Sequence, residues 1–515
     1  MKKEDKPKTI VKALKARIYT NKAGLHQLDE CFAARRRCWN FQVAYQKEMW
    51  ETRKEREDKW IAEGGKEEQE KLKESLEKSL ASDVIVKDSP EHKAAKKEIS
   101  QAGFSLIDIA QADKDFRKLR RSEDEEYSWM QRTPSRLIGD VFKRMGVAYG
   151  EAWKKRRVKG FWKSKKDFAK KPNKGFPRFA KYEDNNYFAC EANQIKWNWE
   201  TNRFKLPNSK LWIKFKLPKE LPEGQLKTCV FTRTPTMKYY IYVVVDTGVP
   251  IPPKKEFDKS STIGLDVGIK NYVTFSDPVQ IQNPKFLEKF DLKLEDGKLS
   301  PYKTDPRLTR RKTIRQRRLS KKIFKSKNYQ KQKLACAKVD EKIADKRSDF
   351  IHELSRALVD MPYNAIAVED LDIMQMKQKK APIKGKDGKY EKNGQAQKRK
   401  LNKQISDVSW GALFNRIEYK TDFEGKNLIK ADRYDPTSKM CKCGYINHDL
   451  KLWQREWVCP KCGEKNDRDI RAAKNTKTFA LKKEEGRKEE EGRKEEEKKK
   501  KLALKNSKEK KNNIA

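Results

Sequence analysis

Asp266 is the first residue whose type and setting indicate chemistry. It lies inside the apolar run 262–270 (TIGLDVGIK), which is typical of a β-strand. Aspartate is disfavoured in strands, and burying a carboxylate without a partner costs free energy. Such a residue usually has a cation, a hydrogen-bond donor or a metal ion beside it. Gly264 and Gly268 would allow another backbone or a ligand to approach this strand closely.

A second apolar run ends in two consecutive acids. Residues 364–369 (NAIAVE) have the pattern of a strand, and Glu369 follows its apolar residues directly. Asp370 comes next, and on a strand its side chain would point to the opposite face. Periodicity alone does not choose between the two acids. We favour Glu369 because the strand pattern is clearest up to that position.

Asp469 is the third acid, at the start of a segment with a helical pattern, 466–475 (NDRDIRAAKN). An anion is favourable at a helix N-terminus, and Asp467 is the local alternative. A capping or salt-bridged acid explains any one of these residues alone. Two-metal hydrolysis of a phosphodiester, however, needs several carboxylates from distant parts of the chain to hold two Mg²⁺ ions. Together, Asp266, Glu369 and Asp469 predict such a site.

Four of the nine cysteines form a second candidate metal site. They occur as two close pairs: Cys441, Cys443, Cys459 and Cys462. Two such pairs are typical of a structural Zn²⁺ ribbon, in which four protein ligands leave no open position. The first pair is C-x-C and not C-x-x-C, His448 is an alternative ligand, and buried free thiols are the other explanation. The scattered remaining cysteines favour a reducing compartment over a disulfide framework.

The charge of the chain predicts a polyanionic partner. Its 515 residues carry 123 basic and 76 acidic side chains, and 123 − 76 gives a net charge of +47. Nucleic acid is the expected partner, because every neutralised phosphate releases counterions. On charge alone, a ribosome-associated or otherwise adhesive protein is an equal alternative. No apolar run is long enough to span a membrane, and the N-terminus lacks the apolar region of a signal peptide.

Two basic segments are candidate nucleic-acid-binding regions. Residues 307–333 contain few apolar side chains and predict a basic helix against a phosphate backbone, with simple solvation as the alternative. The candidate residues are Arg310, Arg311, Arg315, Arg317, Arg318 and Lys321. Residues 153–182 interleave basic and aromatic residues, which suits stacking on bases, although core packing explains some of the aromatics equally well. These aromatics are Trp153, Phe161, Trp162, Phe168, Phe176 and Phe179.

The elements that must position these residues fall into several predicted domains. Residues 10–19 alternate as a strand, and short alternating segments from 175 to 246 predict a small β-barrel. From 262 to 480 strand and helix patterns alternate, which predicts an α/β domain around the three acids. The repeat EEGRKEEEGRKEEEKKKK after 482 is of low complexity, and we predict a solvated helix or disorder without chemistry there.

As a set, these motifs resemble the TnpB (OrfB) family of transposon-encoded proteins and the related miniature type V CRISPR effectors. The resemblance rests on GLDVGIK, on AVEDL, and on a four-cysteine ribbon followed by DRDIRAAKN. Further matching stretches are LKARIY, GFPRF, RRLSKK, FIHELSRALV and ISDVSWGALFNRIEYK. The likeness covers about residues 10–50 and 125–480.

The resemblance implies an RNA-guided, metal-dependent DNA endonuclease that cuts beside a short adjacent motif. It implies a multidomain α+β fold: an RNase H-like (RuvC) α/β nuclease domain with a zinc-ribbon insert, a β-barrel wedge domain and a helical recognition domain. By motif position, Asp266, Glu369 and Asp469 would be catalytic Mg²⁺ ligands, and the four cysteines would hold Zn²⁺. The expected partners are a guide RNA and target DNA, with a monomer or a homodimer on one RNA and no membrane.

The implied location is the cytoplasm or nucleoid of a prokaryote. Three other functions stay open: a guided DNA-binding regulator that does not cut, a transposase or recombinase accessory protein, and a basic RNA-binding protein without activity. The expected domains are wedge 1–24 and 173–255, recognition 25–172, RuvC 256–436 and 467–481, zinc ribbon 437–466, and tail 482–515.

Three features depart from the family pattern. The first cysteine pair is C-x-C, which bears on the geometry of the zinc site. Arg471 stands where asparagine is usual, which bears on the third catalytic motif. The charged region 50–125 is longer than in a compact TnpB. In this respect the chain is closer to a CRISPR-type effector with an enlarged recognition lobe.

Overall fold

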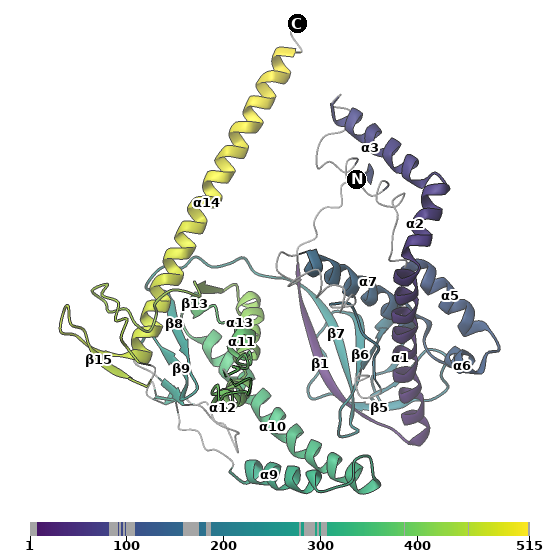
Figure 1. The fold of residues 1–515 in the computed structure, drawn as a ribbon, viewed down its shortest axis with the longest axis horizontal. Helices are drawn as coiled ribbons and strands as arrows, with labels where there is room; N and C mark the ends of the chain where they lie inside the picture. Colours follow the sequence, from purple (N-terminus) through teal and green to yellow (C-terminus); the bar gives the residue numbers. More distant parts are fainter. Residues whose placement is uncertain are drawn as a thin grey trace. The chain divides into compact units, whose positions relative to one another are not determined.

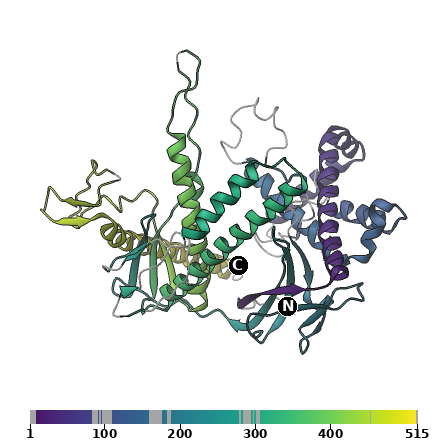
Figure 2. The same ribbon diagram turned by 90° about the horizontal axis from the view of Figure 1, so that it is seen from below.

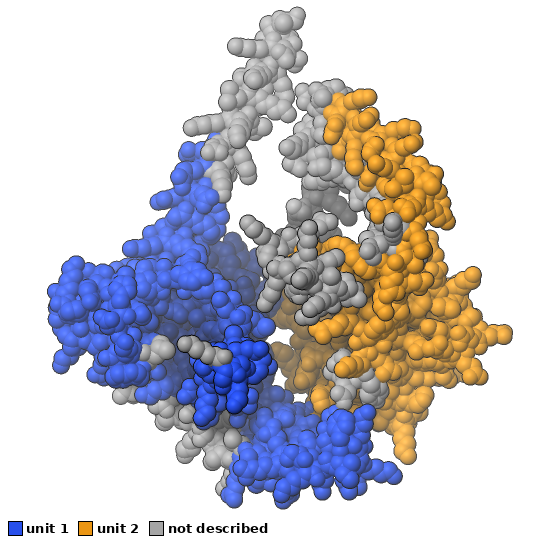
Figure 3. All heavy atoms as spheres, in the orientation of Figure 1, with its two compact units in different colours: residues 1–10, 249–515 blue, residues 11–248 orange. Residues whose placement is uncertain are grey.

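The computed structural model (Figure 1) contains two compact units. It describes residues 8–512, apart from 82–90, 158–174, 182–186, 278–279, 283–293, 296–297, 300–305, 386, 452 and all of 92–108 except 94, 95 and 98. One unit comprises residues 1–10 and 249–515, and the other residues 11–248 (Figure 3). Both combine helices with sheets, so the chain has a mixed α/β multidomain fold. Among the described helices, none combines the length and the apolar character needed to cross a membrane.

A seven-stranded sheet forms the centre of residues 11–248, in the order β2-β6-β7-β1-β5-β4-β3. Its strands are β1 (Thr9–Tyr19), β2 (Tyr187–Glu191), β3 (Lys196–Asn198), β4 (Arg203–Lys205), β5 (Ile213–Lys216), β6 (Gln225–Arg233) and β7 (Tyr239–Pro250). In β5, Ile213 and Phe215 are buried while the intervening lysines are exposed, so one face of the sheet is apolar. The strand predicted for residues 10–19 is confirmed as β1. The strand order leaves β2 and β3 at the two edges, and closure into a barrel stays a prediction.

Helices pack on the apolar face of this sheet. The main ones are α1 (Lys22–Glu51), α5 (Ile109–Arg121) and α7 (Ser135–Arg157), which share one core with the strands. Asn21 caps α1 by accepting a hydrogen bond from the Gly24 N–H. Phe32 of α1 packs edge-on against Phe188 of β2, with ring centroids 5.0 Å apart. The smaller elements are α2 (Arg53–Ala62), α3 (Gly65–Ala81), α6 (Glu125–Ser128), η1 (Trp129–Arg132) and η3 (Ala192–Gln194).

The other unit contains a five-stranded sheet in the order β10-β9-β8-β13-β14. Its strands are β8 (Thr262–Val267), β9 (Asn271–Phe275), β10 (Gln280–Gln282), β13 (Ala365–Glu369) and β14 (Asn427–Ala431). β9 is antiparallel to both of its neighbours, whereas β13 is parallel to β8 and to β14. Parallel strands need long crossover connections, and helices supply them here. The alternation of strands and helices predicted from 262 onwards is confirmed.

The helices of this unit connect the strands and extend beyond them. They are α9 (Pro306–Ser320), α10 (Lys327–Asp360), α11 (Ile373–Met376), α12 (Gln395–Val408), α13 (Trp410–Phe423) and α14 (Arg468–Asn512). Two short hairpins complete the unit, β11 (Leu294–Glu295) with β12 (Lys298–Leu299), and β15 (Glu456–Val458) with β16 (Lys465–Asp467). α14 continues through the charged repeat after residue 482, so helix, one of the two predicted states, is observed there.

The central strands of the five-stranded sheet are buried on both faces. Four of their residues share a core with α10 and α13: Ile263, Leu265, Ile366 and Val368. The alternate residues Ala365 and Ala367 share a core with α14, which lies against the sheet in Figures 1 and 2. Gly264 belongs to this second face, because a Cβ atom there would lie 2.1 Å from the Ala473 carbonyl oxygen of α14. The glycine therefore allows α14 to contact the sheet, as the sequence predicts for this position.

Candidate active site and metal centre

Strand alternation brings the three predicted acids to one face of the sheet. Asp266 follows Gly264 by two residues and Glu369 follows Ala367 by two, so both carboxylates face α14. In the parallel pairing of β8 with β13, Ala367 lies opposite Gly264. Two residues further along the same register, Glu369 comes beside Asp266. Asp469 lies in the first turn of α14, which packs on this face.

Two of the acids affect the third electrostatically. Burial, followed by the negative charges of Glu369 and Asp469, raises the pKa of Asp266 to about 8. Burial is also the main cause of the raised pKa of Glu369. Nearby arginines counteract the shift of Asp266 but do not cancel it. A divalent cation shared by these carboxylates would favour their charged forms and remove the cost of crowding them.

Asp469 pairs with an arginine from the cysteine-rich segment. Arg455 Nη1 donates to Asp469 Oδ1 at 2.6 Å and to Oδ2 at 2.8 Å. The Asn271 side-chain amide lies 3.5 Å from Oδ2 of the same carboxylate. No sequence motif marked Arg455, because only the folding of residues 437–466 brings it to the helix that follows. Predicted metal ligands often have a cation beside them. A search for basic residues near Asp469 in the sequence could have used that signal to find Arg455.

Glu369 is oriented by a loop that α14 holds in place. The Thr437 hydroxyl donates a hydrogen bond to Glu369 Oε1. The Asn475 side-chain amide of α14 in turn donates to the carbonyl oxygens of Thr437 and Met440, each at 2.7 Å. Asn475 therefore connects α14, which carries Asp469, to the loop whose Thr437 hydroxyl contacts Glu369. Thr437 and Asn475 were not predicted as site residues.

The two alternative acids have other partners. Asp370 Oδ2 accepts from Arg433 Nη2 at 3.0 Å, in an ion pair at the surface. Asp467 Oδ1 accepts from the backbone N–H groups of Asp469 and Ile470, each at 2.9 Å, so it caps α14. The charges of Glu369 and Asp469 therefore act on Asp266, whereas Asp370 and Asp467 have different contacts.

The four cysteines meet at a single point. All four sulfur atoms lie within 4.8 Å of one another, and no other group of potential ligands among the described residues is as compact. The Sγ atoms of Cys441 and Cys462 are 3.6 Å apart, as are those of Cys443 and Cys459. Sulfurs at tetrahedral corners about 2.3 Å from Zn²⁺ would be roughly 3.8 Å apart. The cluster therefore fits a zinc ion with its C-x-C pair included, and His448 does not belong to it.

Arg471 links this cysteine cluster to the start of α14. Its Nε atom donates to Asn466 Oδ1 at 2.7 Å, and its Nη2 atom donates to Glu464 Oε1 at 2.9 Å. Asn466 Nδ2 lies 3.6 Å from Cys441 Sγ. Where the family resemblance leads us to expect asparagine, arginine thus makes a longer connection between the cysteines and the helix of Asp469.

The basic candidates lie on α9 and just beyond its end. Five of the six are exposed and Arg315 is partly buried; the six are Arg310, Arg311, Arg315, Arg317, Arg318 and Lys321. Arg311 and Arg315 line a hollow of about 350 Å³ together with Lys331, Lys338 and Lys342 of α10. Cations gathered around an open hollow repel one another, and a bound phosphate would relieve that repulsion. Their role in nucleic-acid binding stays a prediction.

Three family models match the chain. They are described as "Helix-turn-helix domain" over residues 10–55, "Probable transposase" over 242–380 and "Cas12f1-like, TNB domain" over 410–476. The first two are models of the OrfB family.

Curated relatives cover most of the chain. One from Streptomyces pristinaespiralis, named "Putative RNA-guided DNA endonuclease", is 30% identical over 311 residues, which are 60% of this chain and 66% of the relative. InsQ of Escherichia coli K12 has the same description and is 25% identical over 350 residues, 68% of this chain and 75% of the relative. This chain thus spans about two thirds of the first relative. A solved Cas12f1–sgRNA–target DNA complex aligns with a TM-score of 0.40 at 13% identity, covering 91% of this chain and 99% of that one.

Proposed function

This chain belongs to the OrfB (TnpB) family of transposon-encoded proteins, and on that basis we propose that it is an RNA-guided DNA endonuclease. It would cut a target DNA beside a short adjacent motif, with Asp266, Glu369 and Asp469 as the catalytic metal ligands. The observation that supports the proposal most is that two neighbouring strands and a helix carry these acids on one side of a mixed sheet, where Glu369 and Asp469 raise the pKa of Asp266. The names of the curated relatives support the same reaction class.

The donor set suits a hard divalent cation. All three proposed ligands are carboxylates, and Mg²⁺ prefers oxygen ligands. When bound, two Mg²⁺ ions would activate water and stabilise the leaving oxygen of the phosphodiester. Strands β8 and β13 carry Asp266 and Glu369, and the Thr437 hydroxyl donates a hydrogen bond that orients Glu369. Arg455 neutralises Asp469 and would be available to a phosphate oxygen near the same carboxylates.

We further propose the domain roles that the resemblance implies. The five-stranded sheet with α14 would be the RuvC domain, residues 256–436 and 467–481, and residues 437–466 would be its zinc-ribbon insert with Zn²⁺ on the four cysteines. Residues 1–24 and 173–255 would form the wedge, and residues 25–172 the recognition domain. The basic surface of α9 would contact the guide RNA or the target DNA. The complex would act in the cytoplasm or nucleoid of a prokaryote, as a monomer or a homodimer on one RNA.

Plasmid cleavage by the protein purified with its own RNA tests this function. Wild type should linearise only a plasmid that matches the RNA, and only with Mg²⁺. Asp266→Asn should abolish linearisation, because it removes a proposed metal ligand. Asp370→Asn is the matched control: it changes an acid at the end of the neighbouring strand that pairs with Arg433, and it should keep activity.

The same assay separates the alternatives. Binding of the matching target by wild type without cutting would instead identify a guided DNA-binding regulator. Action on transposon ends without RNA would identify a transposase, as in the description of the model that matches residues 242–380. Cleavage that ignores the sequence of the RNA would overturn the guided reaction.

A further inference from the structure

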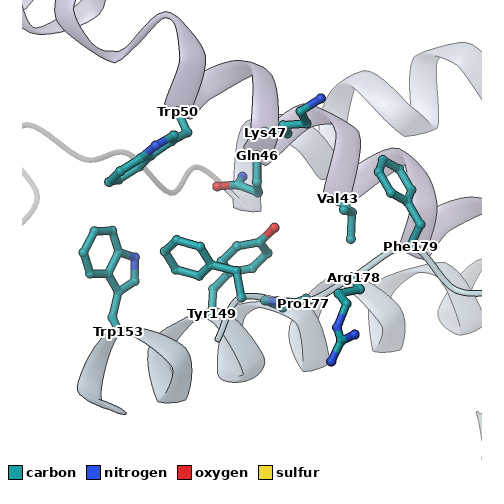
Figure 4. Close-up of a pocket in the computed structure, with 10 residues that line it drawn as sticks. Val43, Gln46, Lys47, Trp50, Tyr149, Trp153, Pro177, Arg178 and Phe179 are labelled. Carbon is teal, nitrogen blue, oxygen red and sulfur yellow. The ribbon is translucent and has the colours of Figure 1, made fainter. Parts of the chain in front are cut away.

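An open pocket of about 330 Å³ lies between α1, α7 and the segment 176–179, within the unit of residues 11–248 (Figure 4). Its volume is in the range of small-ligand sites, about 300–1,000 Å³. Five aromatic side chains line it: Trp50, Tyr149, Trp153, Phe176 and Phe179. None of these residues belongs to the carboxylate site or the cysteine cluster.

The aromatic walls pack on one another around Phe176. Its ring centroid lies 5.5 Å from that of Tyr149, 5.4 Å from that of Trp153 and 6.1 Å from that of Trp50. Figure 4 shows Trp50 and Trp153 together at one end of the pocket and Phe179 at the other. Three of the aromatics predicted to stack on bases therefore line this pocket: Trp153, Phe176 and Phe179. The other predicted aromatics, Phe161, Trp162 and Phe168, lie outside the described residues.

The segment that carries Phe176 is fixed to α1 by hydrogen bonds. Asn40 Oδ1 accepts from the Ala180 N–H at 2.7 Å, and Asn40 Nδ2 donates to the Ala180 carbonyl oxygen at 3.2 Å. Trp39 Nε1 donates to the Arg178 carbonyl oxygen at 2.8 Å. The GFPRF motif therefore has a defined backbone position, and the pocket is a built feature of the unit.

Gln46 supplies a polar group in the wall of this aromatic pocket. Its side chain is only 4% exposed, and neither its amide oxygen nor its amide nitrogen has a hydrogen-bond partner among the described residues. In Figure 4 the amide lies on the pocket side of α1, facing the Tyr149 hydroxyl. A buried amide without partners costs free energy. A ligand that both donates and accepts hydrogen bonds, as the edge of a nucleobase does, would supply what the amide lacks.

The rim of the pocket is positively charged. Lys47 and Arg178 line it and are exposed, and the Arg156 guanidinium lies 4.1 Å from the centroid of the Phe176 ring. Aromatic faces beside cations are the usual means of binding an unstacked base with its phosphate. This arrangement suits a nucleotide better than an apolar peptide, which would offer no hydrogen-bond partner to the Gln46 amide.

We propose that this pocket binds one unpaired nucleobase of an RNA strand. The aromatic rings would stack on the base, Gln46 would bond to its edge, and Lys47 and Arg178 would contact the adjoining phosphates. RNA is the expected source because folded RNA exposes single bases in loops and bulges, whereas the bases of a duplex are stacked and paired. The choice of RNA over DNA rests on the proposed function. The inference that the pocket binds a base rests on the pocket residues alone.

An eight-nucleotide RNA with a single 2-aminopurine among abasic positions tests the site in the full-length protein. Because the strand has only one base, no neighbouring base can replace it in the pocket. Stacking should quench the fluorescence of 2-aminopurine, and the strand should bind wild type at least tenfold more tightly than a wholly abasic RNA. Gln46→Leu should weaken binding of the single-base strand about tenfold and leave the abasic strand unchanged.

Gln42→Leu is the matched control for this experiment. Gln42 lies one turn earlier on α1, is fully buried, and has an amide equally without partners among the described residues, but it does not line the pocket. Equal losses in the two variants, or equal binding of the single-base and abasic strands by wild type, would refute the site. Tighter binding of the corresponding DNA strand would refute the assignment to RNA.

Failure of the proposed function would look different. If the protein quenches the probe but cuts no matching plasmid, the base pocket is supported and the nuclease proposal is refuted. A protein that cuts its guided target but does not distinguish the single-base from the abasic strand would retain the nuclease and lose the pocket.

Discussion

Replacing Asp266 with asparagine should stabilise the metal-free protein while removing its response to Mg²⁺. Burial and the neighbouring carboxylates raise the pKa of Asp266 to about 8, from an ordinary value of 3.8. The folded state therefore binds a proton between these values that the unfolded state does not bind. Consequently this residue lowers the free energy of unfolding progressively as the pH rises from about 4 to about 8. Asparagine has nearly the same shape and no charge, so the variant should lack this contribution.

The size of the effect follows from the shift. Each unit of pKa corresponds to about 1.4 kcal/mol, so a rise from 3.8 to about 8 sets an upper limit of roughly 6 kcal/mol on the cost of ionised Asp266. The residue is partly exposed, and solvent screening reduces this cost. We expect a gain of about 2 kcal/mol at pH 8, or roughly 4–8 °C in Tm for a unit of this size. At pH 5 the gain should be smaller, because the cost of ionised Asp266 accumulates progressively between about pH 4 and about pH 8.

Thermal unfolding in EDTA and in Mg²⁺, at pH 5 and pH 8, measures both parts of this prediction. In EDTA the variant should melt above wild type at pH 8, with a smaller difference at pH 5. Added Mg²⁺ should raise the Tm of wild type, because ligand binding stabilises the folded state, and should change the variant little. Asp370→Asn should follow wild type throughout. The electrostatic reasoning would be refuted if the variant melted below wild type in EDTA at pH 8. It would also be refuted if Mg²⁺ raised the Tm of the variant as much as that of wild type.

Three further predictions follow from the contacts around the carboxylates, the cysteine cluster and the basic helix. Arg455→Ala removes a cation that pairs with Asp469, so the Mg²⁺ concentration for half-maximal thermal stabilisation should fall about threefold to tenfold, even as cleavage slows. Cys441→Ser should lower the zinc content from one ion per chain to below half by elemental analysis, whereas a chain that never held zinc would show none in either form. The pair Arg311→Gln and Arg315→Gln should weaken RNA binding and reduce the slope of log affinity against log salt by about two; an unchanged slope would exclude phosphate contacts there.

The strands around the acids could be predicted because their chemistry is local. A carboxylate inside an apolar run, or directly after one, marks Asp266 and Glu369 without knowledge of the fold. The choice between Glu369 and Asp370 needed the register, since both follow the same run and only their faces differ. Gly264 was predicted to permit a close approach, but the sequence did not identify α14 as the element that approaches.

The partners of the site could not be predicted, because they depend on contacts between distant segments. Arg455 reaches Asp469, and Thr437 reaches Glu369, only after residues 437–466 have folded. Gln46 has no sequence signal at all. A glutamine in a long helix is ordinary. Only the structure shows that the Gln46 amide is buried without hydrogen-bond partners among the described residues, beside the segment 176–179, which begins 130 positions further along the chain.

The shared face of Gly264, Asp266 and Glu369 has a consequence for insertions and deletions. Adding or removing one residue within β8 between Gly264 and Asp266 would turn the carboxylate towards α10 and α13, because side chains alternate with a period of two. Adding two residues would return it to the α14 side, one strand repeat further along. Because a strand rises about 3.3 Å per residue, that shift would move the carboxylate roughly 7 Å from its place beside Glu369. An even insertion should therefore keep the faces of the strand and lose the metal site, whereas an odd one should also bury the charge among apolar side chains.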